Sequence, residues 1–181
     1  MIIYFVRHAS AGQHTPNPKK DEKRPLDSDG IEQCGFVGRA LAALNAQPDV
    51  IISSPLKRAT QTASLIGNEL GYEGKLQLEP ALRPESTFAE FRRMLEKYAK
   101  HEGIMVVGHN PSITEFLARM IAKSGSEALL DFKKGAVARA ETIRHAATIN
   151  WFFTPKIARE IQAAAAAVAA AEKSHPKTSR K

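Results

Sequence analysis

The sequence predicts an α/β fold: a three-layer αβα sandwich whose central sheet is largely parallel and carries helices on both faces. Short apolar runs rich in β-branched residues alternate with longer segments whose apolar residues recur at helical spacing. The length of 181 residues and the hydrophobic content of 43% are enough for a domain with a real core. We expect one domain over residues 1–155, and a separate terminal segment over residues 156–181.

The chain begins with an apolar run, and residues 2–6 are expected to form a buried strand. Residues 11–27 contain several prolines and charges and are expected to form a loop. A helix should then begin near Asp29, with this aspartate as its N-cap and Glu32 three residues later. Apolar residues at helical spacing continue this helix through residues 31–44.

The middle of the chain repeats the alternation. Residues 50–52 form a second apolar strand, and a Ser-Ser-Pro sequence ends it. A second helix follows over residues 56–70, and Gly71 can terminate it because glycine readily adopts the left-handed backbone conformation. Residues 76–78 are a weak third strand.

The later part of the chain also alternates predicted strands and helices. Phe88 to Tyr98 shows helical spacing, residues 104–107 form a fourth strand, and another helix begins near Ser112. Residues 136–143 and 146–153 are expected to be two further strands that pair with each other.

The terminal segment has a different composition. Residues 157–172 are rich in alanine, which favours a helix. The last residues, SHPKTSRK, are expected to be a basic, disordered tail.

Charge and composition exclude several classes. The net charge of +7 and the pI of about 9.6 favour anionic partners. Aromatic residues make up only 7% of the chain and are not interleaved with basic ones, so we expect no nucleic-acid binding. The single cysteine, Cys34, excludes an internal disulfide and is expected to be a small buried apolar residue. No apolar run is long enough to span a membrane or to form a signal-peptide core, so we expect a cytoplasmic protein.

Unusual polar residues follow three of the expected strands. Ligands of open α/β sheets bind outside the carboxyl ends of the strands. The first strand ends in Arg7-His8, the second in Ser53-Ser54-Pro55 followed by Arg58, and the fourth in Gly108-His109-Asn110-Pro111. If these ends share one edge, two arginines and two histidines line one pocket.

These residue types suit a phosphoryl group. Arginines match the oxygens of a phosphate, and a neutral histidine can attack phosphorus and carry it covalently. Nearby cations favour the neutral form of His8, and activity should fall as the pH drops through its pKa. Each residue alone is more often structural, but four together at sheet ends favour a catalytic site.

Three segments of the sequence resemble the signature segments of the histidine phosphatase superfamily, which has the phosphoglycerate-mutase-like fold. They are VRHAS, SSPLKRATQTA and VVGHNPSITE. The segment KDEKRPLDSDG, the short chain and the lack of an inserted cap are most similar to the SixA-like phosphohistidine phosphatase branch. The resemblance extends from Met1 to about Pro155.

The resemblance implies roles for individual residues. It makes His8 the nucleophile that becomes phosphorylated, with Arg7 and Arg58 on the phosphoryl oxygens and His109 as the second pocket histidine. It implies no metal and no cofactor. The candidates for substrate binding are Arg24 and Asp21, at the mouth of the site, and Ser54 and Asn110.

Two features depart from the family pattern. The residue after the nucleophile is Ala9 rather than glycine, so this loop must use an ordinary backbone conformation. The general acid of mutases and broad phosphatases is missing, because Pro84 and Asn110 occupy the two positions where family members carry it. Glu85 and Asp21 are the candidates to replace it.

The missing acid bears on the substrate. An alkoxide leaving group needs a proton, whereas the conjugate acid of imidazole has a pKa near 6.5 and imidazole leaves more easily. We therefore expect a phosphohistidine phosphatase that acts on a phosphorylated protein, such as a histidine phosphotransfer domain. One alternative is a phosphatase for small phosphomonoesters that uses Asp21 or Glu85 as its acid, and another is an inactive domain that binds phosphoprotein.

Overall fold

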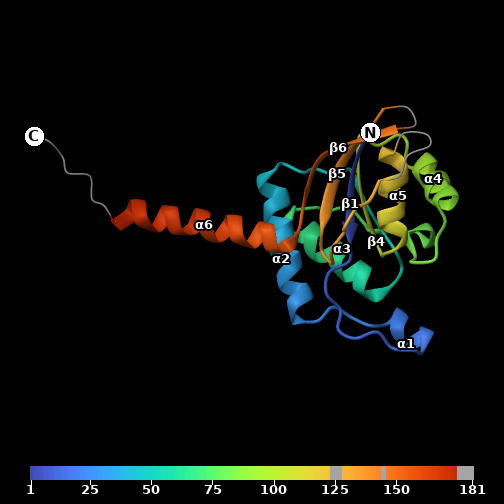
Figure 1. The fold of residues 1–181 in the computed structure, drawn as a ribbon, viewed down its shortest axis with the longest axis horizontal. Helices are drawn as coiled ribbons and strands as arrows, with labels where there is room; N and C mark the ends of the chain where they lie inside the picture. The colour runs from blue at the N-terminus through green and yellow to red at the C-terminus, as the bar shows by residue number, and fades with distance from the viewer. Residues whose placement is uncertain (123–127, 144–145, 175–181) are drawn as a thin grey trace, which may run out of the picture.

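The computed structural model describes residues 1–122, 128–143 and 146–174. Six strands form one sheet in the order β3-β2-β4-β1-β5-β6 (Figure 1). Four of them run parallel, and the last two are antiparallel to their neighbours. The strands are β1 (Ile2–Arg7), β2 (Val50–Ser53), β3 (Gln77–Leu78), β4 (Gly103–Gly108), β5 (Val137–Ile143) and β6 (Ala146–Phe153).

Helices cover both faces of this sheet, which confirms the predicted fold class. They are α1 (Pro18–Glu22), α2 (Ser28–Ala43), α3 (Lys57–Glu69), α4 (Phe88–Lys97), α5 (Ser112–Ile121) and α6 (Pro155–Ser174), with a short 3-10 helix over Pro80–Leu82. Successive side chains of a strand point to opposite faces, and a strand covered on both sides must therefore be apolar throughout. This requirement explains the uninterrupted apolar runs of β1 and β4.

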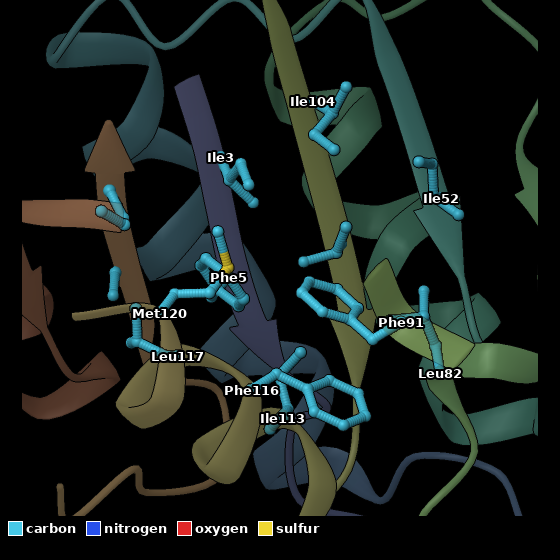
Figure 2. Close-up of a cluster of buried hydrophobic side chains, with 14 of the residues drawn as sticks. Ile3, Phe5, Ile52, Leu82, Phe91, Ile104, Ile113, Phe116, Leu117 and Met120 are labelled. Carbon is cyan, nitrogen blue, oxygen red and sulfur yellow. The ribbon is translucent and has the colours of Figure 1, made fainter. Parts of the chain in front are cut away.

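The two faces carry two separate cores. On one face, Ile3 and Phe5 of β1 pack with α4 and α5, and Figure 2 shows Phe5, Phe91 and Phe116 in this cluster. The rings of Phe91 and Phe116 stack with centroids 4.5 Å apart. On the other face, Tyr4 and Val6 pack with α2 and α3. The sheet is thus held from both sides, which fixes the positions of its strand ends.

The prediction for the start of α2 was wrong by two residues. The N-cap is Asp27, whose carboxylate accepts a hydrogen bond from the backbone N–H of Gly30, and not Asp29. Both aspartates precede apolar residues at helical spacing, so the local pattern does not distinguish them. Asp27 is selected because the other oxygen of its carboxylate binds the loop that follows β1.

The segment predicted as a loop, residues 11–27, contains the short helix α1. Asn17 caps it by accepting a hydrogen bond from the backbone N–H of Lys20, and Pro18 occupies the first helical position. A five-residue helix has little stability of its own. Its contacts with the rest of the protein, described below, hold it in place.

The terminal helix α6 begins on the body of the protein and then projects away from it (Figure 1). Ala158 is buried against the core on the α2 side, and the side-chain amide of Gln162 donates to the carbonyl of Phe36 at 2.8 Å. Residues 163–173 are exposed. The end of the predicted tail, residues 175–181, lies outside the described residues. No described helix is long and apolar enough to cross a membrane.

Candidate active site

The ends of β1, β2 and β4 meet at one edge of the sheet, as the sequence predicted. Arg7 is paired with Gly108, and Ser53 with Val107. The backbone N–H of His8 donates to the carbonyl of Gly108 at 3.0 Å. His8, Ser54 and His109 therefore leave three adjacent strands at the same level.

The hydrogen bonding of His8 determines which of its ring nitrogens is free. Its Nδ1 lies 2.7 Å from the carbonyl oxygen of Ala9, and a carbonyl can only accept, so Nδ1 carries the proton. Nε2 therefore keeps its lone pair. The residue is only 7% exposed. Burial, together with the charges of Arg58 and Arg7, lowers the pKa of His8 to about 3, so its ring is neutral near pH 7.

His109 lies against His8, and the ring centroids are 4.9 Å apart. Its Nε2 is 2.9 Å from the hydroxyl oxygen of Ser54. The residue is 1% exposed, and burial followed by the neighbouring His8 lowers its pKa to about 2. A neutral ring whose Nε2 accepts from Ser54 carries a proton on Nδ1, which is then a donor for a ligand.

Three buried side-chain nitrogens have no hydrogen-bond partner within the described part of the chain. They are Arg7 Nε, Arg58 Nε and His109 Nδ1. Buried donors are normally paired, and three unpaired donors on three neighbouring residues indicate a missing acceptor. An anion with several oxygens, such as a phosphoryl group, would satisfy all three.

Both arginines are held by their terminal nitrogens. The Nη1 atom of Arg7 donates to the carbonyl of Phe132 at 2.8 Å. Arg58 is 5% exposed, and its Nη1 donates to the backbone carbonyl of Asp21 at 3.0 Å and to its carboxylate at 3.1 Å. Burial lowers the pKa of each guanidinium, yet arginine remains charged near neutral pH. The site thus keeps two oriented positive charges.

The resemblance predicted Asp21 at the mouth of the site, and in the structure its side chain is buried and contacts Arg58. Its carboxylate accepts from Arg58 and from Arg24 Nε at 2.9 Å. Burial alone would raise the pKa of Asp21, but these two arginines outweigh it and lower the pKa. Arg24 also donates to the backbone carbonyls of Ala11 and Gly12. Asp21 is therefore an ionised anchor for α1 and for Arg58.

The other predicted residues have different surroundings. The hydroxyl of Ser54 is engaged with His109, so the serine supports that ring. The amide of Asn110 donates to the carbonyl of Phe132 at 3.2 Å, and its oxygen accepts from Thr114 at 2.7 Å. The side chain of Glu85 is 68% exposed and lies 3.8 Å from Arg83.

Sequence reasoning missed the residues that shape the loop after His8. The backbone N–H of Ala9 donates to Thr62, and the hydroxyl of Thr62 donates to the carbonyl of Arg58 at 2.7 Å. Asp27 accepts from the hydroxyl of Ser10 at 2.8 Å and from the N–H of Gly12 at 2.6 Å. The aspartate before α2 was a visible signal, but only the fold shows that it reaches this loop.

The segment before β5 was also missed. The carbonyl of Phe132 receives both Arg7 and Asn110. The N–H of Gly135 donates to the carbonyls of Arg7 and His8 at 3.1 Å each. Gly135 has a φ of +71°, which favours glycine. Most of these contacts are made by backbone carbonyls. Every residue type carries one, so the sequence gives no signal for them.

Ala9 has the ordinary backbone conformation that we expected. Among the described residues, positive φ occurs only at Asn45, Gly12, Gly71 and Gly135. Ala9 is fully buried. The change from glycine is accommodated because this loop does not need the left-handed conformation.

Comparisons with known proteins identify the family. The family model described as the histidine phosphatase superfamily, branch 1, matches residues 3–91. An uncharacterised protein of Picosynechococcus sp. is 31% identical over 140 residues, which cover 76% of this chain and 82% of that protein. The chain belongs to the histidine phosphatase superfamily, as its signature segments predicted.

Solved structures agree at the level of the fold. The protein histidine phosphatase SixA, solved with tungstate, matches with a TM-score of 0.76 and 22% identity over 86% of this chain and 97% of that chain. The α-ribazole phosphatase from Shigella flexneri matches with a TM-score of 0.63 and 16% identity over 86% and 97%. Since two phosphatases with different names share the fold, the substrate must be argued from the site.

Proposed function

We propose that this protein is a SixA-like phosphatase that removes the phosphoryl group from a histidine of a phosphorylated protein, with His8 as the nucleophile. The observation that carries the proposal is the set of three unpaired buried nitrogens, on Arg7, Arg58 and His109, beside a histidine whose Nε2 is free. This arrangement combines a nucleophile with donors for the group that it attacks. A histidine phosphotransfer domain is the kind of partner that would supply the substrate.

The first step transfers the phosphoryl group to the enzyme. The lone pair of His8 Nε2 attacks phosphorus in line and forms a new P–N bond. The P–N bond to the substrate histidine breaks, and the substrate imidazole takes the electron pair and then a proton from solvent. The carbonyl of Ala9 accepts from Nδ1–H and stabilises the positive charge that develops on the His8 ring.

The second step regenerates the enzyme. Water attacks phospho-His8, the P–N bond breaks, and the electron pair returns to Nε2 as inorganic phosphate leaves. Throughout both steps, Arg7, Arg58 and the Nδ1–H of His109 hold the phosphoryl oxygens. Most of the rate acceleration should come from this positioning and charge stabilisation. These steps need no metal ion, and the described residues contain no group of three or more His, Cys, Asp or Glu side chains placed to hold one.

The choice of leaving group follows from the carboxylates near the site. The pKa of Asp21 is lowered, so this residue is ionised and has no proton to donate. Glu85 is exposed and lies near Arg83. Imidazole leaves without strong acid catalysis, whereas an alkoxide does not. The site therefore favours phosphohistidine over an alkyl phosphomonoester.

The two alternative functions, a phosphatase for small phosphomonoesters and a domain that only binds phosphoprotein, would need different features of the site. A phosphomonoesterase would need one of these carboxylates to be protonated. A domain that only binds phosphoprotein would need the arginines but not a histidine whose ring nitrogen is kept free for attack. The orientation of His8 supports a catalytic role.

The test is phosphate release from a phosphohistidine protein and from phosphoserine, in EDTA. We expect the wild type to hydrolyse the phosphohistidine protein and to form an acid-labile phosphoenzyme. His8→Ala should show neither activity, whereas His101→Ala, at the opposite edge of the sheet, should show both. Faster release from phosphoserine would favour the phosphomonoesterase, and full activity of His8→Ala would exclude the proposed nucleophile.

A further inference from the structure

Helix α1 and its C-cap lie over one side of the site and are strongly basic. Residues 18–24 read PKKDEKR and contain four cations and two carboxylates. Both carboxylates are engaged with arginines of other elements. Asp21 contacts Arg58 at 3.1 Å, and Glu22 contacts Arg83 at 2.7 Å. The buried Asp21–Arg58 pair holds the segment over the site, and the two pairs together neutralise both of its carboxylates.

The lysines of this segment remain uncompensated. Lys19, Lys20 and Lys23 are exposed, and none of them forms an ion pair with another described residue. Arg24 is turned inward, to Asp21 and to the carbonyls after His8. The outer surface of residues 18–24 therefore presents three positive charges to solvent, beside Arg58.

A second basic segment lies on another side of His8. Gly135 donates its N–H to the carbonyls of Arg7 and His8, which places Lys133 and Lys134 next to the nucleophile. Lys133 is paired with Asp131 at 2.7 Å. Lys134 is exposed and unpaired among the described residues, and its charge helps to lower the pKa of Asp27 beneath the loop after His8.

We propose that Lys19, Lys20, Lys23 and Lys134 form a basic rim that binds acidic side chains around the phosphohistidine of the protein substrate. This inference rests on the proposed function. The donors that await the phosphoryl group are buried nitrogens, whereas the rim lysines are exposed at the surface. The rim therefore serves groups beyond the phosphoryl group, and in a phosphohistidine protein those groups are the neighbouring side chains.

Complementary charge should act mainly on association. Exposed charges steer an oppositely charged partner and raise the rate of encounter, and salt screens them over about 10 Å at 0.1 M. The rim should therefore raise kcat/KM for an acid-flanked phosphohistidine, and added salt should remove the effect. The rim should have little effect on kcat/KM for a neutral substrate of the same length.

The test uses two synthetic peptides of equal length, with one phosphohistidine flanked by glutamates or by glutamines. At low salt we expect the wild type to prefer the glutamate peptide by about tenfold in kcat/KM, and the preference to shrink at 0.5 M NaCl. In the triple variant K19Q/K20Q/K23Q the preference should fall to about twofold. The matched control K75Q/K100Q/K173Q removes the same charge from exposed lysines away from the site, which form no ion pair with another described residue, and it should keep the wild-type preference.

The outcomes separate this inference from the function on which it rests. If the wild type hydrolyses neither peptide, the proposed function is wrong. If it hydrolyses both at equal rates, or if K19Q/K20Q/K23Q keeps the full preference, the function stands and the basic rim is wrong. An equal loss in both triple variants would assign the effect to net charge and would also overturn the rim.

Discussion

At the scale of single residues, hydrogen-bond partners give two identical side chains different roles. His8 and His109 are both buried and neutral, and their rings lie side by side. A carbonyl takes the Nδ1 proton of His8 and leaves Nε2 free to attack. When the hydroxyl of Ser54 donates to Nε2 of His109, the proton of this ring is on Nδ1, which can then donate. The proposed nucleophile, His8, and the proposed clamp, His109, are thus distinguished by their neighbours and not by residue type.

The environment of His8 also refines the expected pH dependence. Burial lowers the pKa of His8 to about 3, so the proposed nucleophile stays neutral far below pH 6.5. A loss of kcat/KM caused by protonation of His8 should therefore occur near pH 3. A rate that stays constant down to pH 5 is compatible with His8 as the nucleophile.

Asp21 offers the sharpest single-residue prediction. Asp21→Asn removes the charge that pairs with Arg58 but keeps the shape of the side chain and the backbone carbonyl to which Arg58 also donates, so Arg58 should be held less firmly. We expect kcat/KM for a phosphohistidine protein to fall about tenfold, which is about 1.4 kcal/mol, because a buried ion pair that loses one charge leaves the other uncompensated. The measurement is steady-state phosphate release.

The control is Glu22→Gln, which alters the exposed ion pair with Arg83 and should have a small effect. If Asp21 were a general acid, Asp21→Asn would affect the two kinds of substrate differently. If Asp21→Asn slowed only phosphoserine and spared phosphohistidine, Asp21 would be the acid of a phosphomonoesterase and not an anchor.

At the scale of elements, the loop after β1 depends on its contact with the first turn of α2. A Cβ atom on Gly30 would lie 2.0 Å from the carbonyl oxygen of Ser10. That oxygen belongs to the backbone of the loop that follows His8, so it cannot move without disturbing the loop. Asp27 reinforces the same contact, because its carboxylate binds both the loop and the N-terminus of α2.

Gly30→Ala should therefore destabilise the protein by about 1–3 kcal/mol and lower its activity. Gly35→Ala, in the same helix, is the matched control. Its Cβ would meet only the end of the Arg39 side chain at 3.0 Å, and alanine should gain about 0.5–1 kcal/mol in helix stability. Urea unfolding of the two variants tests the expected loss of stability in Gly30→Ala and the expected gain in Gly35→Ala. A Gly30→Ala protein as stable as the wild type would contradict the close contact.

At the scale of the whole molecule, the buried histidines link catalysis to stability. The unfolded chain binds a proton at each histidine near pH 6.5, whereas the folded protein keeps His8 and His109 neutral until about pH 3 and pH 2. Between the pKa values of the folded and the unfolded states, the unfolded state therefore binds more protons than the folded state. Stability must therefore fall as the pH falls.

The predicted slope is up to about 1.4 kcal/mol per pH unit for each of the two histidines. Urea unfolding at pH 7.0, 6.0 and 5.0 measures it. His109→Asn removes one titrating group and should lower the slope by about half of the histidine contribution. An unchanged slope in this variant would mean that His109 is not buried in its neutral form.

The sequence alone determined the αβα class, because strand and helix periodicities are local properties that burial imposes directly. It also located His8, His109, Arg7 and Arg58, since polar residues that end apolar strands stand out against the core pattern. The signature segments identified the family for the same reason. Each of these features lies within a few consecutive residues.

Only the tertiary structure decided how these residues are used. It showed that Asp21 pairs with Arg58, that Ser54 supports His109, and that Asp27 rather than Asp29 caps α2. It also showed that residues 18–22 form a helix. These features depend on partners far away in the chain, often on backbone carbonyls, which carry no sequence signal. Hydrogen bonds are short and directional, so the fold must bring both partners together before either can be recognised.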